Sequence, residues 1–264
     1  MKKYFIYTVS VLWIIWANPS SARHQQINPP NAMDSLSSNQ KIRSKNFKNT
    51  IPITGIIVPA TALAYGFVKL NNSALTKLDE KARQEFYAQH PHRKFTIDDY
   101  LQFAPGAAVF TLNAMGIKGK NSLTDQGGVY LVSNIILNTT CQSLKRITAV
   151  TRPNGAPNSF PSGHAAEAFA SAEFLRQEYN EISPWYTVSG YSAAVLVGYL
   201  RMYNNKHWLS DVISGAGLGI LSTQTSYWLY PKIKNLFSDR SKNNTIILPS
   251  YNHGAMGAGM VKKF

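Results

Sequence analysis

Three clusters of charged and polar side chains in the second half of the sequence could bind and cleave a phosphate ester. Lysine and arginine supply lasting positive charge, and the planar donor fork of arginine matches phosphate oxygens. A histidine beside a carboxylate can act as a nucleophile, and a second histidine can move protons. In chain order the clusters are Lys145 with Arg152, then Ser162 with Gly163 and His164, then Arg201 with His207 and Asp211.

The first cluster lies where an apolar helix is expected to end in a loop. Residues 152–161 contain three prolines, which exclude a helix there. Lys145 and Arg152 would then stand beside a rigid loop and bind an anion. A solvated basic helix end, favoured by the helix dipole, is the alternative interpretation of these two residues.

In the second cluster, Ser162 and Gly163 precede a helix expected over residues 165–179. The free N–H groups of a helix N-terminus form a ready anion site, and glycine lets an oxyanion approach the backbone closely. His164 would lie at the mouth of that site, where it could donate a proton. An ordinary serine N-cap followed by a surface histidine is the alternative.

The third cluster pairs a histidine with a carboxylate. His207 and Asp211 are four residues apart and share one face if they lie on a helix. The carboxylate could then fix the imidazole tautomer and activate the ring as a nucleophile. Arg201 would add a third cation, whereas a surface His–Asp pair would carry no chemistry.

Taken together, the clusters resemble the signature of the type 2 phosphatidic acid phosphatase family, which is related to vanadium-dependent haloperoxidases. The family pattern reads K-x6-RP, PSGH and SR-x5-H-x3-D, and the chain departs from it only at Leu200, where the family has serine. That serine is an accessory hydroxyl of the phosphate pocket, so the change concerns binding strength or substrate fit rather than the reaction type. The resemblance spans roughly residues 95–231. Residues 98–105 and 201–208 are also similar to envelope lipid phosphatases of Gram-negative gut bacteria, some of which act on lipid A.

The resemblance implies an all-α, membrane-associated helical bundle whose active site lies where three loop–helix junctions converge. His207 would attack phosphorus and form a phosphohistidine, and Asp211 would hold its tautomer. His164 would protonate the leaving oxygen and then activate water. The phosphate oxygens would be bound by Lys145, Arg152, Ser162, the Gly163 N–H and Arg201.

No metal and no cofactor are expected, because the three cations can stabilise the transition-state charge and the sequence offers no carboxylate cluster for a metal. The expected substrate is a phosphomonoester or pyrophosphate of an envelope lipid: lipid A, phosphatidic acid, phosphatidylglycerol phosphate or undecaprenyl pyrophosphate. Aromatic residues expected around the phosphate are Phe160, Tyr203 and Trp208.

Other functions remain open at this stage. The chain could be a non-specific periplasmic acid phosphatase, or a vanadium-dependent haloperoxidase with His207 as the vanadate ligand. A non-catalytic envelope binding protein is disfavoured, because every chemically essential residue is present.

The net charge of +14 on 264 residues first suggests nucleic acid or an anionic membrane as partner. Residues 1–50 carry seven basic and one acidic side chain, and residues 232–264 carry six and one. Because the excess lies in the two ends, the pattern favours an anionic lipid surface over nucleic acid, with solubility as the plain alternative. The single cysteine, Cys141, excludes an intrachain disulfide and a cysteine-based zinc site.

The order of segments predicts export. Residues 1–22 have the features of a signal peptide, with an uncleaved anchor as the alternative, and residues 23–50 form a flexible basic linker. A helical phosphatase domain over residues 51–231 and a basic, glycine-containing tail over 232–264 would follow. The expected location is the periplasm, on or in the inner membrane, with the active site facing the periplasm.

Helices are expected throughout the body, because strand-like alternation is scarce. Three of the expected segments are long and charge-free enough to cross a bilayer, yet their polar content is high and the mean hydropathy of the chain is −0.18. A bundle that sits on or partly in a membrane fits both facts. The three segments are residues 51–68, 182–200 and 212–230, and further helices are expected over 73–90, 96–101, 103–117, 127–144 and 165–179.

Overall fold

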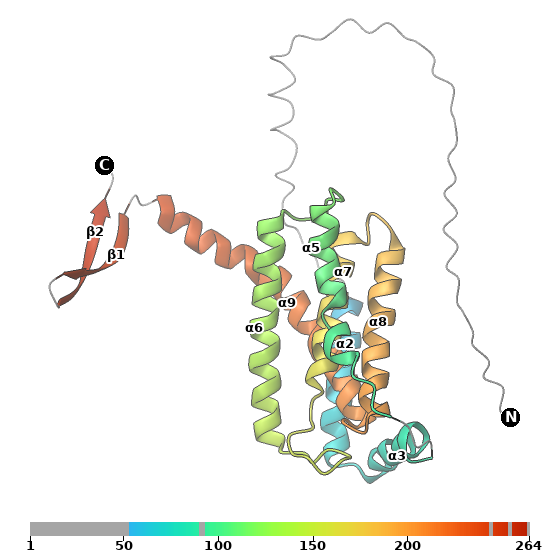
Figure 1. Cartoon of the computed structure of the whole chain (residues 1–264). Helices are drawn as coiled ribbons and strands as arrows, with labels where there is room; N and C mark the ends of the chain where they lie inside the picture. Colours follow the sequence, from blue (N-terminus) through green and yellow to red (C-terminus); the bar gives the residue numbers. More distant parts are fainter. Residues whose placement is uncertain (1–52, 90–92, 243–244, 253–254, 263–264) are drawn as a thin grey trace, which may run out of the picture. The chain divides into compact units, whose positions relative to one another are not determined.

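The computed structural model describes residues 53–89, 93–242, 245–252 and 255–262. The expected signal peptide and linker, residues 1–22 and 23–50, lie outside the described residues. Helices make up the part of the chain that carries the three clusters, which confirms the expected all-α bundle (Figure 1). In chain order the helices are α2 (Ile53–Leu70), α3 (Ser73–Arg83), the π-helical turn η1 (Gln84–Ala88), α4 (Asp98–Leu101), α5 (Ala104–Ala114), α6 (Leu123–Thr148), α7 (Gly163–Tyr179), α8 (Pro184–Tyr203) and α9 (Leu209–Lys242).

Helix α7 is the central helix of the bundle. It packs against α9, α8, α5 and α6, and its small side chains are buried along most of its length. The alanines of α7 let neighbouring helices approach, while Phe174 and Tyr179 pack with Tyr227 of α9 in the largest apolar cluster. The Tyr179 hydroxyl also donates to the backbone carbonyls of Val109 and Ile117. Because α7 is covered on so many sides, its N-terminus is held in a fixed place.

Glycines of α9 set its close approach to α7. A Cβ atom added at Gly215 would lie 2.5 Å from the carbonyl oxygen of Ser162. One added at Gly219 would overlap the carbonyl oxygen of Ala166. Backbone therefore lies against backbone along this pair of helices, and no larger residue fits.

The C-terminal part has more regular structure than the expected tail. The expected domain boundary at residue 231 falls inside α9, since Pro231 removes one backbone donor without ending the helix. Strands β1 (Thr245–Asn252) and β2 (Ala255–Lys262) then pair antiparallel, from Thr245 opposite Lys262 to Asn252 opposite Ala255. No strand was expected there, because glycine and alanine make up much of β2 and give weak strand signals.

Within the described ranges, no helix combines the length and the apolar character that a membrane crossing requires. This includes α2, α8 and α9, which overlap the three segments considered for that role.

Candidate active site

The first cluster is arranged by the end of α6 and the loop that follows it. Ala149 ends the helix in a left-handed conformation, with φ of 45°. The loop then folds back, because the N–H of Ser159 donates to the carbonyl of Val150 at 2.7 Å. The buried Lys145 ammonium donates to the carbonyl oxygens of Asn158, at 3.0 Å, and Ser159, at 3.4 Å. The proline-containing segment is thus a loop, as expected, and Lys145 holds it in place.

The second cluster opens α7 in the expected way. Ser162 is the N-cap, and its hydroxyl accepts from the N–H of Ala165 at 3.4 Å. The N–H of Ser162 donates to the carbonyl oxygen of Asp211 at 3.0 Å, which joins this loop to the start of α9. Gly163 is the first helical residue, so its N–H belongs to the free N-terminal set.

The third cluster forms at the start of α9. His207 and Asp211 are both buried, and the Nδ1 atom of His207 lies 3.4 Å from Oδ2 of Asp211. The same Oδ2 accepts from the backbone N–H of Trp208 at 2.9 Å, which closes the first turn of α9. This geometry places the proton of a neutral His207 on Nδ1 and leaves Nε2 as the basic nitrogen.

Burial governs the protonation of His207. Removal from water lowers the pKa of this imidazole to about 4, and the charges of Lys145 and Arg201 act in the same direction. Asp211 opposes that shift but does not overcome it. His207 is therefore neutral at physiological pH, the state that a nucleophile requires.

Arg201, at the C-terminal end of α8, is the most buried cation of the site. Its Nη1 donates to Oδ2 of the fully buried Asp98 at 2.5 Å and lies 3.4 Å from Oδ1 of Asp99. Leu200, which stands where the family has serine, is also buried.

Two guanidinium donors point to an anion as the ligand. The Nε atoms of Arg152 and Arg201 are buried and have no hydrogen-bond partner among the described residues. An unmet buried donor is costly, and one on a charged group more so. Burial, and to a lesser extent the positive charge of Arg201, lowers the pKa of Arg152. The oxygens of a phosphate group are the acceptors that fit this pair.

The predicted residues thus converge from α6, its following loop, and the ends of α7, α8 and α9. Electrostatic interactions couple Lys145 with Arg152, Arg201 and Asp211, and His164 with Arg201. In the described part of the chain, no three histidine, cysteine or acidic side chains gather closely enough to hold a metal ion.

Sequence reasoning missed three contributors. Ser159 donates a hydrogen bond to Oδ2 of Asp211, and its hydroxyl lies 3.5 Å from Nδ1 of His207. Asp98 and Asp99 belong to α4, where Asp98 contacts Arg201 and Asp99 contacts His164. The similarity of residues 98–105 to envelope lipid phosphatases gave these two carboxylates no role, because they lie more than 60 positions from their partners in the sequence.

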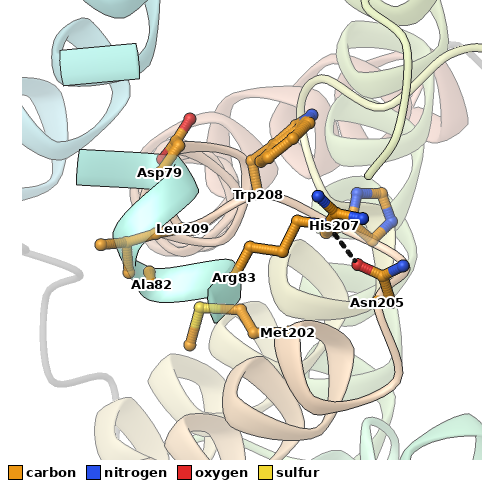
Figure 2. A pocket seen from close by; sticks show the side chains of 8 residues that line it. All are labelled: Asp79, Ala82, Arg83, Met202, Asn205, His207, Trp208 and Leu209. Atoms are coloured by element: carbon orange, nitrogen blue, oxygen red, sulfur yellow. Dashed lines mark hydrogen bonds between the residues drawn. The ribbon is translucent and has the colours of Figure 1, made fainter. Parts of the chain in front are cut away.

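A pocket lies beside His207, between α3 and the start of α9 (Figure 2). Arg83 reaches across it toward His207, and its Nε donates to Oδ1 of Asn205 at 3.1 Å. Asp79 ties the two helices together, since it accepts from the N–H of Ser210 at 2.9 Å and from its hydroxyl at 2.7 Å. Helix α3 therefore supports the loop that presents His207.

Comparison with known proteins agrees with this geometry. A family model described as the PAP2 superfamily matches residues 126–235, the stretch that holds all three clusters. Residues 126–235 thus match the PAP2 superfamily. The resemblance inferred from the three clusters is thereby confirmed at the level of the family.

Two curated relatives extend the match. The lipid A 1-phosphatase of Porphyromonas gingivalis is 33% identical over 192 residues, which cover 70% of this chain and 40% of that protein. The bacitracin transport permease protein BcrC of Bacillus licheniformis is 35% identical over 98 residues, which cover 36% of this chain and 46% of that protein. The matched region thus spans less than half the length of either relative.

Two solved PAP2-type structures are similar at low identity. The crystal structure of Aquifex aeolicus LpxE has a TM-score of 0.46 at 20% identity and covers 56% of this chain and 94% of that one. The first transmembrane PAP2-type phosphatidylglycerolphosphate phosphatase from Bacillus subtilis has a TM-score of 0.43 at 20% identity and covers 68% and 96% of the two chains.

Proposed function

We propose that this protein hydrolyses a phosphate ester of an envelope lipid through a phosphohistidine on His207. The observation that carries the proposal is the buried His207, whose Nδ1 lies 3.4 Å from Asp211 and whose pKa is lowered by burial and by the charges of Lys145 and Arg201. A neutral imidazole with a fixed tautomer is a nucleophile, and the cations are placed to stabilise the charge that builds on phosphate oxygens.

The reaction has two balanced steps. In the first, Nε2 of His207 forms a bond to phosphorus while the bond to the leaving oxygen breaks, and His164 gives its proton to that oxygen. In the second, His164 takes a proton from water, the resulting hydroxide attacks phosphorus, and the bond to His207 breaks to release phosphate. Arg152, Arg201 and the Gly163 N–H bind the non-reacting oxygens, and no metal or cofactor takes part.

The substrate class is proposed from the surface and from one relative. Apolar side chains stand exposed on several outer helices, among them Val58 on α2, Leu131 on α6 and Val195 on α8. Such a surface suits contact with lipid, and the basic chain ends suit an anionic one. The Porphyromonas gingivalis relative carries the name lipid A 1-phosphatase. Lipid A, phosphatidic acid, phosphatidylglycerol phosphate and undecaprenyl pyrophosphate are therefore the substrates to compare.

The proposed location is the periplasmic face of a membrane. Its support is the sequence of residues 1–22, a positive start, a short apolar stretch and small residues before Arg23. A reporter that is active only outside the cytoplasm, fused after Gly254, should give signal. A silent reporter in a well-expressed fusion would exclude export.

The covalent step provides the test of the function. Wild-type protein quenched during turnover should carry acid-labile phosphate on His207, and His207→Ala should abolish both the phosphate and the release of product. Asp211→Asn should lower kcat more than it raises KM, because its role lies in the transition state. His253→Ala, outside the three clusters, is the matched control and should leave turnover unchanged. Near-normal turnover by a folded His207→Ala protein would overturn the mechanism.

A further inference from the structure

We propose that Asp99 of α4 is a positioning residue for the general acid: it holds His164 in the orientation and protonation state in which it donates to the leaving oxygen. This inference rests on the proposed function. Asp99 lies outside the three signature clusters.

The contacts of Asp99 carry the proposal. Its Oδ1 accepts from Nε2 of His164 at 2.9 Å and lies 3.4 Å from Nη1 of Arg201. One carboxylate oxygen thus joins the general acid to a phosphate-binding cation. A carboxylate that holds one imidazole nitrogen while the other exchanges a proton is the arrangement by which enzymes orient catalytic histidines.

Helix α4 is fixed well enough to perform this role. Asp98, next to Asp99, is fully buried and pairs with Arg201 at 2.5 Å. The segment before the helix is held by Asn204, whose side chain accepts from the N–H of Phe95 at 2.9 Å and donates to its carbonyl at 2.7 Å. The short helix therefore cannot slide along α8, and the Asp99 carboxylate stays beside His164.

Charge explains why His164 needs this partner. Burial and the positive charge of Arg201 lower the pKa of His164, so the imidazole tends to lose the proton that it must donate. Asp99, through its hydrogen bond and its charge, and Asp98, through its charge, act in the opposite direction. These three groups, on α8 and α4, are the charged side chains that set the protonation of His164.

The test compares two substrates that differ in leaving group. One is a long-chain alkyl phosphate, whose leaving alkoxide must be protonated, and the other is a nitrophenyl phosphate bearing the same chain, whose leaving group departs without a proton. Asp99→Asn should lower kcat/KM at least about tenfold for the alkyl ester, and by less than about threefold for the nitrophenyl ester. For the alkyl ester, the alkaline limb of the pH profile should move to lower pH, and Asp99→Glu should recover part of the loss.

Glu181→Gln removes an exposed carboxylate from the turn between α7 and α8 and is the matched control, with no expected effect on either substrate. The Asp99 side chain is 42% exposed, so its variants should fold, which thermal unfolding checks. If Asp99→Asn does not fold, Asp99→Ser is used for the same two readouts. Equal losses on both substrates, or no loss on either, would refute the role of Asp99. Wild-type protein inactive on both substrates would instead refute the proposed function.

Discussion

At the scale of single residues, one physical effect acts on both histidines with opposite consequences for chemistry. Burial lowers the pKa of His207 and of His164. For His207 the shift helps, because the nucleophile must be neutral. For His164 the shift hinders, because a general acid must carry its proton. The carboxylates follow this division: Asp211 contacts His207 through the nitrogen that keeps its proton, and Asp99 counteracts the shift of His164.

The lowered pKa values of His207 and His164 predict an acidic optimum for kcat/KM. Activity should be lost below about pH 4, where His207 becomes protonated, and lost again as pH rises through a His164 pKa below the ordinary 6.5. The profile, measured with two substrates whose phosphate pKa values differ, separates titration of the protein from that of the substrate. His164→Ala should lack the alkaline limb. A rate that stays constant from pH 6 to pH 9 would contradict the assignment of the acid.

The sequence was sufficient to predict the residues proposed to bind and attack phosphate, and insufficient for those that hold them in place. Lys145, Arg152, Arg201 and His207 could be predicted, because a charge-bearing pattern at fixed spacing has few other uses. Ser159 could not, because a serine in a loop has many possible partners, and only the fold brings it to Asp211.

At the scale of elements, the site depends on where helices start and stop. Ser162 caps α7, Asp211 closes the first turn of α9, and Ala149 ends α6. A helix terminus therefore positions a segment of each of the three clusters. Helical segments could be predicted from apolar runs and breakers, and each expected helix of the body has a counterpart. The pairing of β1 with β2 could not, since it depends on contacts that alternation in the sequence does not reveal.

The α7–α9 contact gives a test at this scale. Gly219→Ala should lower the free energy of unfolding by about 1–3 kcal/mol, because the new methyl group meets the backbone carbonyl of Ala166, which cannot move aside. Activity should fall with it, since α7 and α9 carry Ser162 and Asp211. The measurement is the midpoint of thermal or denaturant unfolding, together with turnover.

Gly127→Ala is the matched control for that substitution. Gly127 also lies inside a helix, α6, but a Cβ atom there meets nothing within 4 Å. Alanine should therefore stabilise the protein by about 0.5–1 kcal/mol through helix propensity alone. Equal effects of the two substitutions would show that close packing of α7 on α9 does not limit stability.

At the scale of the whole molecule, we expect the surface to distinguish substrates, because the cations proposed to bind phosphate would not distinguish one phosphate ester from another. The structure changes which side chains can do so. Phe160, expected beside the substrate, is buried and packs edge-on against Phe67, with the two ring centroids 5.2 Å apart. The indole N–H of Trp208 donates a hydrogen bond to the backbone carbonyl of Thr151. Among the described residues, an exposed apolar side chain that directly follows a site residue is Tyr100, after Asp99.

This exposed side chain leads to a prediction about substrate preference. Each methylene buried beside the phosphate contributes about 0.8 kcal/mol, so a few of them outweigh the differences among soluble esters. We expect kcat/KM for detergent-dispersed lipid A or phosphatidic acid to exceed that for a small soluble phosphomonoester by at least about a hundredfold, equal to ~2.7 kcal/mol of transition-state binding. Replacing Tyr100 with serine should reduce this ratio at least about fivefold while leaving the rate on the soluble ester unchanged. Leu236→Ser, an exposed apolar position on α9 outside the site, is the control and should leave the ratio intact.

Equal efficiencies of wild-type protein on lipid and soluble esters would identify a general acid phosphatase, because a pocket that gains nothing from an apolar chain has no means of selecting a lipid.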